Sequence, residues 1–172
     1  PPDTWYRAIN AVYPSLIRVE ADEVTYGMHI MLRFELENAI VSGDLSVPDL
    51  PYAWNQGMTR YLGVTPDSDA NGVLQDIHWS QGYIGYFPDY LLGSMLSAQL
   101  WKAVAGELEG TREQVKNGNL TNINAWMVKR VQGEGGSFTF PEMAYRATGE
   151  EFGAEAYLEY LGTKYGALYD LT

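Results

Sequence analysis

The chain has 172 residues, of which 46% are hydrophobic, 13% aromatic and 19% charged. This composition excludes intrinsically disordered, collagen-like and low-complexity classes, and the length is typical of one domain or of a large part of a longer protein. Eleven Lys and Arg residues against twenty-two Asp and Glu residues give a net charge of −11. Because such a chain repels phosphate backbones and anionic lipids, nucleic acid and membranes are not expected among its partners.

The chain begins at Pro1-Pro2 without Met, which we interpret as a fragment boundary. No apolar run is long enough to cross a bilayer. Asp3 is expected to cap a short helix that runs towards Val12. Pro14 and Ser15 then predict the entry of a long helix, Ser15 to Val41, of roughly 40 Å at 1.5 Å per residue.

Polar residues form a narrow stripe on this predicted long helix. Ile17, Met28 and Leu32 belong to one broad apolar side, and Leu16, Ile30 and Phe34 to the opposite side. The stripe between them contains Arg18, Asp22, Thr25, Tyr26, His29 and Arg33. Charges inside a buried helix must be paired or face a wet cleft. Two interpretations stay open: a satisfied Arg18–Asp22 pair with a core histidine, or a functional cleft.

Helices also account for the rest of the chain. We expect them from Asp49 or Pro51 to Leu62, Pro88 to Leu108, Asn119 to Arg130, Pro141 to Thr148, and Glu150 to Tyr165. Trp126 and Met127 are expected to face inwards. Polar turns separate these segments, and period-two strand patterns are absent. The sequence therefore predicts an all-α fold, a helical bundle forming a single domain over residues 1–172.

The densest polar and aromatic cluster falls between residues 75 and 90. It comprises Gln75, Asp76, His78, Trp79, Tyr83, Tyr86 and Tyr90. If residues 72–80 are helical, Gln75 and His78 share a face at i, i+3. Converging Tyr and His side chains can donate hydrogen bonds to a developing oxyanion. The alternative is an aromatic core corner that Gly82, Gly85 and Pro88 turn.

The chain offers few metal ligands. It contains no cysteine, which excludes disulfides, thiolate metal sites and a Cys nucleophile and suits a reducing cytoplasm. Its only histidines are His29 and His78, so no zinc site with two or three His ligands close in sequence can be built from this chain alone. We expect residues 1–172 to bind no metal.

Two long motifs resemble a known family. Residues 8–10, 14–26 and 29–30, together with the G-x-x-Q-D-x-H-W pattern at residues 72–79, are similar to the carboxypeptidase-Taq family of zinc metallocarboxypeptidases. Residues 85–88, 90, 91 and 93 continue the similarity, as do residues 147–150 and the segment from Tyr157-Leu158 to Tyr165. The resemblance covers essentially the whole chain.

The resemblance implies that this is the C-terminal third of a protein about three times longer. The HEXXH helix and the glutamate that complete the zinc site would precede Pro1. It also implies the C-terminal part of a neurolysin-like, cleft-containing helical fold, usually homodimeric, and removal of single residues from peptide C-termini with broad specificity. Zinc, or another divalent metal, would belong to the full-length enzyme, which we expect to be cytoplasmic.

Site residues follow from the same resemblance, position by position. Arg18 matches the arginine that grips the terminal carboxylate of the substrate, which suits a planar guanidinium fork, and Asp22 is expected to orient it. His78, Tyr86 and Tyr90 match catalytic positions, the tyrosines as cleft residues that stabilise the oxyanion. Gln75 and Asp76 are expected to support substrate binding. The competing hypothesis is a stand-alone helical interaction or dimerisation module without catalysis.

Overall fold

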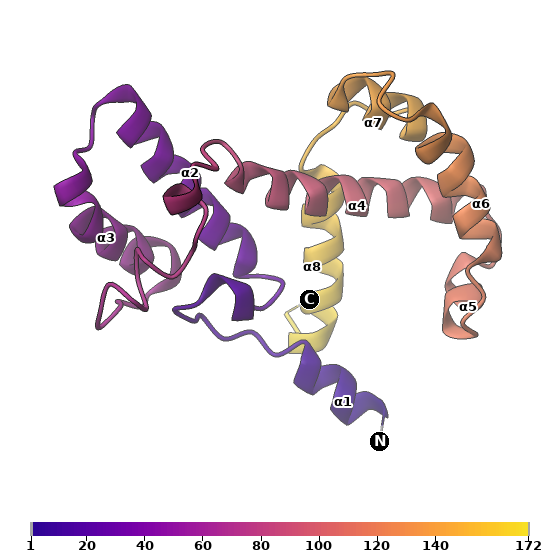
Figure 1. Ribbon diagram of the computed structural model, residues 1–172. Helices are drawn as coiled ribbons and strands as arrows, with labels where there is room; N and C mark the ends of the chain where they lie inside the picture. The colour runs from indigo at the N-terminus through magenta and orange to yellow at the C-terminus, as the bar shows by residue number, and fades with distance from the viewer. Residues whose placement is uncertain (1, 172) are drawn as a thin grey trace. The chain divides into compact units, whose positions relative to one another are not determined.

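A computed structural model describes residues 2–171, and every regular element in that range is helical. The α-helices are α1 (Pro2–Ile9), α2 (Tyr26–Ser42), α3 (Leu50–Leu62), α4 (Phe87–Glu107), α5 (Thr111–Lys116), α6 (Thr121–Arg130), α7 (Phe140–Thr148) and α8 (Glu155–Tyr169) (Figure 1). Short 3₁₀ helices are η1 (Arg18–Glu20), η2 (Val47–Asp49), η3 (Trp79–Gln81) and η4 (Gln132–Glu134). The predicted all-α class is confirmed over these residues.

Two compact units divide the chain, residues 1–91 and 92–172. Helix α4 begins in the first and continues into the second. The expectation of a single domain stays a prediction.

The core of the first unit lies between α2 and α3, which run side by side (Figure 1). Leu32 from α2 packs with Trp54 and Met58 from α3, and all three are almost completely buried. A Cβ atom at Gly57 would come within 2.2 Å of the Leu32 side chain. The glycine therefore permits the close approach of the two helices.

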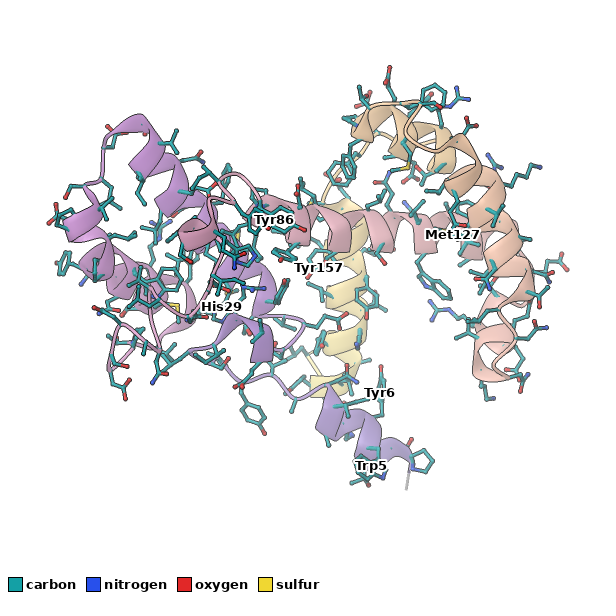
Figure 2. All side chains as sticks on the ribbon, in the orientation of Figure 1. Trp5, Tyr6, His29, Tyr86, Met127 and Tyr157 are labelled. Atoms are coloured by element: carbon teal, nitrogen blue, oxygen red, sulfur yellow. The ribbon has the colours of Figure 1, made fainter. Side chains whose placement is uncertain are left out.

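The second unit has its own apolar cluster. Leu100 and Val104 from α4 pack with Trp126 from α6 and Ala147 from α7, and Met127 packs against this cluster. Trp126 is buried and Met127 is partly buried (labelled in Figure 2), so the predicted inward orientation of both is confirmed.

The predicted helix from Ser15 to Val41 is wrong in its first half. The chain forms η1 at Arg18–Glu20, turns, and enters α2 only at Tyr26. The reason is Asp22, whose Oδ1 accepts hydrogen bonds from the backbone N–H groups of Val24 and Thr25, both at 2.9 Å. An aspartate that bonds the backbone two and three residues ahead favours a turn over a continuous helix.

Other predicted elements agree with the structure to different degrees. Helices α3, α4, α6 and α7 are confirmed to within two residues at each end, whereas α8 begins five residues later than expected and α5 was not predicted. Residues 72–78 form turns rather than a helix, with the Leu74 N–H bonded to the carbonyl of Asp69. The expected i, i+3 helical face of Gln75 and His78 is therefore wrong.

Helix α1 buries none of its side chains. Trp5 is 72% exposed and Ile9 75% exposed, and Figure 2 labels Trp5 and Tyr6 on this helix. None of the helices in residues 2–171 is both long and apolar enough to span a membrane.

Candidate functional site

Two arginines share one carboxylate in the first unit. Arg18 donates from Nε and Nη2 to Oδ1 of Asp76 at 3.0 and 2.7 Å, and Arg33 donates from Nε to Oδ2 at 2.6 Å. Arg18 is only 6% exposed and Arg33 is fully buried. Because two guanidinium groups meet a single carboxylate, this cluster keeps one positive charge without a counter-ion within it.

Gln75 connects both arginines to the backbone. Its Oε1 accepts from the backbone N–H of Arg18 at 2.9 Å and from Nη2 of Arg33 at 2.8 Å. Its Nε2 donates to the carbonyls of Leu16 and Asn71. The side chain therefore uses both of its donors and accepts twice, which makes it a support of the cluster.

The expected Arg18–Asp22 pair is wrong. Oδ2 of Asp22 accepts from the Tyr13 backbone N–H at 3.0 Å and from Oγ1 of Thr25 at 2.9 Å, while its Oδ1 holds the turn before α2. The expected spacing of one helical turn does not exist here, since residues 18 and 22 do not lie on one helix. The carboxylate that orients Arg18 is Asp76.

Arg18 still has donors to offer. A guanidinium carries five N–H groups. Two of those of Arg18 point to Asp76, and one on Nη1 donates to Oη of Tyr26 at 3.3 Å. One N–H on Nη1 and one on Nη2 therefore have no hydrogen-bond partner among residues 2–171.

Aromatic rings surround the arginines. The guanidinium of Arg18 lies 5.1 Å from the ring centre of Tyr90 and 5.9 Å from that of Phe87. The guanidinium of Arg33 lies 4.6 Å from the ring centre of Trp54. These cation–π contacts partly replace the water that burial removes from the cations.

The contacts within this cluster determine the charge states of Asp76, Arg18 and Arg33. Burial alone would raise the pKa of Asp76, but the hydrogen bond from Arg18 and the charge of Arg33 outweigh it and hold this pKa below its usual range. Burial would lower the pKa of Arg18, yet Asp76 raises it above its usual value. Burial lowers the pKa of Arg33 to about 10. All three groups are therefore charged at neutral pH.

His78 and the tyrosines lie next to this cluster. Nε2 of His78 and Oη of Tyr90 are 3.0 Å apart, and the ring centres of His78 and Tyr86 are 5.8 Å apart. Burial lowers the pKa of His78 below its usual value, although Asp76 acts against the shift. Tyr86 is 46% exposed. The structure thus brings together Arg18, Gln75, Asp76, His78, Tyr86 and Tyr90, and it leaves Asp22 in the turn before α2.

Sequence reasoning did not select two further residues of this region. Arg33 was noted in the polar stripe but given no role, and Glu37 was not noted. Glu37 follows Arg33 by four residues, so it extends the stripe by one turn of α2. A carboxylate one turn beyond Arg33, on the same face of a helix with a broad apolar surface, is the signal that would have found it.

Comparison with known proteins identifies the family. Residues 2–165 match the family model described as carboxypeptidase Taq (M32) metallopeptidase. Carboxypeptidase 1 of Bacillus subtilis (strain 168) is 44% identical over 167 residues, which are 97% of this chain and 33% of that protein. Thermostable carboxypeptidase 1 of Thermus thermophilus is 44% identical with the same coverage. The chain belongs to the carboxypeptidase Taq (M32) metallopeptidase family.

Solved structures agree with the family assignment. The chain superposes on the M32 carboxypeptidase of Deinococcus radiodurans R1 with a TM-score of 0.95 at 40% identity, covering 99% of this chain and 34% of that one. The chain thus spans about a third of the length of the curated relatives it matches. The predicted resemblance, the length ratio and the predicted helical fold are confirmed.

Members of this family are metallopeptidases, which raises the question of whether the described residues could hold a metal ion. Residues 2–171 contain no group of three His, Cys, Asp or Glu side chains arranged for metal binding. Nδ1 and Nε2 of His29 are buried without a hydrogen-bond partner, but His29 lies beside the cations Arg33 and Arg18. The described residues therefore do not fit a metal site.

Proposed function

We propose that residues 1–172 are the substrate-binding part of a metal-dependent carboxypeptidase that hydrolyses the C-terminal peptide bond of peptides with broad specificity. The relatives are carboxypeptidases by name. The observation that carries the proposal is the arginine pair with one carboxylate, where Arg18 has one free N–H on Nη1 and one on Nη2. A peptide carboxylate would supply the missing negative charge and accept both donors.

The other site residues have supporting roles in this proposal. Asp76 and Gln75 hold Arg18 in place, whereas Asp22 acts only through the turn that begins α2. His78, Tyr86 and Tyr90 are proposed to stabilise negative charge that develops on the carbonyl oxygen, with Tyr86, which is 46% exposed, as the most accessible donor.

The metal belongs to the proposal as well. We place the ligands of zinc, or of another divalent ion, in a part of the longer enzyme outside residues 1–172, which would be inactive alone. A homodimer and a cytoplasmic location also stay predictions. A stand-alone interaction module is the alternative, and the exposed apolar side chains of α1 are the observation that favours it.

Substitution of Arg18 in the full-length enzyme tests the proposal. Charge-assisted hydrogen bonds contribute roughly 1.5–3 kcal/mol, so Arg18→Ala should lower kcat/KM for a free-acid peptide by roughly 10- to 150-fold. Arg18→Lys should recover little, because an ammonium lacks the fork. A peptide amidated at its C-terminus has no carboxylate, so its slow turnover should hardly change.

The decisive quantity is the ratio of kcat/KM for the free-acid and amidated peptides. Arg60→Ala is the matched control, because Arg60 is exposed and pairs with Glu35 at the surface of the same unit. It should leave the ratio unchanged. An equal loss on both peptides in Arg18→Ala would assign Arg18 to stability alone and remove it from substrate binding.

A further inference from the structure

The stretch of chain that leads from His78 to Tyr86 lies largely at the surface. Residues 80–86 are exposed. Backbone turns hold them locally, and in one of these the Tyr83 N–H donates to the carbonyl of His78 at 2.9 Å. Two glycines in it, Gly82 and Gly85, adopt positive φ values of 79° and 83°. Something outside the segment must therefore hold it in one conformation.

A buried carboxylate from α2 does so. Oε2 of Glu37 accepts from Nε1 of Trp79 at 2.7 Å, and its Oε1 accepts from the backbone N–H of Gly85. Trp79 directly follows His78, and Gly85 directly precedes Tyr86. One side chain thus fixes both ends of the segment. We call Glu37, Trp79 and Gly85 the Glu37 clamp.

The energetics of the clamp point to a role beyond stability. Glu37 is 6% exposed and has no cationic partner among the described residues. A buried carboxylate loses much of its hydration, and two neutral donors offset this loss only in part. An apolar side chain could fill the same space without that penalty. A buried charge is useful here because it accepts two hydrogen bonds in fixed directions.

Neighbouring rings transmit this restraint to the site. Trp79 packs edge-on against Trp54 and Phe87, with ring centres 6.3 and 5.7 Å apart. Phe87 in turn lies 4.4 Å from the ring centre of His78. A displacement of the Trp79 indole would therefore displace the His78 imidazole through one intervening ring, that of Phe87.

We propose that Glu37 is a positioning residue, which holds His78 and Tyr86 in their reactive geometry through Trp79 and Gly85. The inference rests on the proposed function, since it presumes that His78 and Tyr86 act on the substrate. Helix α2 then supports the site twice: Arg33 holds Asp76, and Glu37, one turn later, holds the segment 79–85.

The test uses Glu37→Gln in the full-length enzyme. An amide of the same size accepts through one oxygen only and turns an NH₂ group towards the second donor, so one bond of the clamp is lost. Because small displacements of positioned groups cost up to about 100-fold, kcat should fall by about 10- to 100-fold while KM changes less than about twofold. Trp79→Phe removes the indole donor together with part of the ring that packs on Trp54 and Phe87, and it should lower kcat in the same direction.

Glu107→Gln is the matched control. Glu107 accepts from Nε1 of Trp126 at 2.9 Å, which is the same carboxylate–indole bond in the second unit. Hydrogen–deuterium exchange followed by mass spectrometry reads out the structure independently of activity. Glu37→Gln should raise uptake in the peptide that covers residues 79–86, whereas Glu107→Gln should raise it around Trp126 and leave kcat unchanged.

The two readouts separate the possible failures. Unchanged uptake at residues 79–86 in Glu37→Gln, or raised uptake with an unchanged kcat, would overturn the positioning role. A wild-type full-length protein without carboxypeptidase activity would instead overturn the proposed function, and the exchange data would still decide whether the clamp exists.

Discussion

His29 lies in the first unit with both ring nitrogens buried and without a hydrogen-bond partner among the described residues (labelled in Figure 2). Burial lowers its pKa to about 4, and the charges of Arg33 and Arg18 act in the same direction, against Asp76 and Asp22. The imidazole is therefore neutral at pH 7. A second proton on the ring would have no hydrogen-bond acceptor among the described residues.

This histidine should make the protein less stable in mild acid. The unfolded chain binds a proton at His29 below about pH 6.5, whereas the folded chain does so only near pH 4, so stability is lost as the pH falls through this range. Between pH 7 and pH 5 the loss from His29 is about 2 kcal/mol. His29→Gln should therefore lose about 2 kcal/mol less than wild type.

Urea unfolding at pH 7 and pH 5 measures both differences. The lowered pKa of His78 contributes with the same sign in both proteins and cancels in the comparison. An equal loss of unfolding free energy in wild type and His29→Gln would show that His29 is not the responsible group.

At the residue scale, the sequence indicated which candidate residues lie together better than which of them form pairs. Gln75, Asp76 and His78 stand in the dense polar and aromatic cluster, and the family motifs contain all three together with Arg18. Asp76 was not identified as the partner of Arg18, because it lies 58 residues away and helical periodicity relates only neighbours. Proximity in the sequence favoured Asp22 as the partner of Arg18. The turn at residues 22–25 excludes this pair, because residues 18 and 22 do not lie on one helix.

At the scale of elements, helix α2 depends on a residue outside it. The carboxylate of Asp22 accepts hydrogen bonds from Tyr13, Val24 and Thr25 and so fixes the turn that leads into the helix. Without this carboxylate, only backbone hydrogen bonds such as that from the Tyr26 N–H to the carbonyl of Asp22 would hold the start of α2. Helix α2 contains three buried polar side chains, those of His29, Arg33 and Glu37. The turn at Asp22 therefore helps to determine where these side chains lie.

Removal of that carboxylate should destabilise the fold. Asp22→Ala should cost about 0.5–2 kcal/mol of unfolding free energy, the range observed for lost capping residues. Asp22→Asn keeps one acceptor oxygen and should cost about half as much. Chemical denaturation at pH 7 measures both values, and equal losses would contradict a role through hydrogen bonding.

Helix ends were predictable where the chain carries strong local signals. Proline at the start and glycine after the end mark α3 and α7, and in α7 Thr139 and Glu142 also form a capping box. Helix α5 has six residues, too few for apolar periodicity to appear, so it was missed. The late start of α8 was missed because residues 150–154 contain no breaker except Gly153.

At the scale of the whole molecule, residues 1–172 are a third of the length of their relatives. Because the described residues 2–171 contain no group of side chains arranged to hold a metal ion, we expect the chain alone neither to bind zinc one-to-one nor to release C-terminal amino acids. A chelator should leave its thermal midpoint unchanged, because no bound ion contributes to folding.

Isothermal titration calorimetry, a peptide hydrolysis assay and circular dichroism melting with and without chelator check these three outcomes. The full-length enzyme is the positive control and should lose activity in the chelator. One-to-one zinc binding by residues 1–172 would contradict the assignment of the metal ligands to another part of the enzyme.

The shared carboxylate of Asp76 also bears on the order of folding events. Its two arginine partners precede it by 58 and 43 residues, so a long loop must close before each cation meets this counter-ion. Contacts between α2 and α3 are shorter in range and can form earlier. We expect the charge cluster to form after the transition state for folding. It should therefore affect mainly the unfolding rate of the native chain rather than its folding rate. The residues proposed to bind the substrate would then also be those that set the lifetime of the folded state.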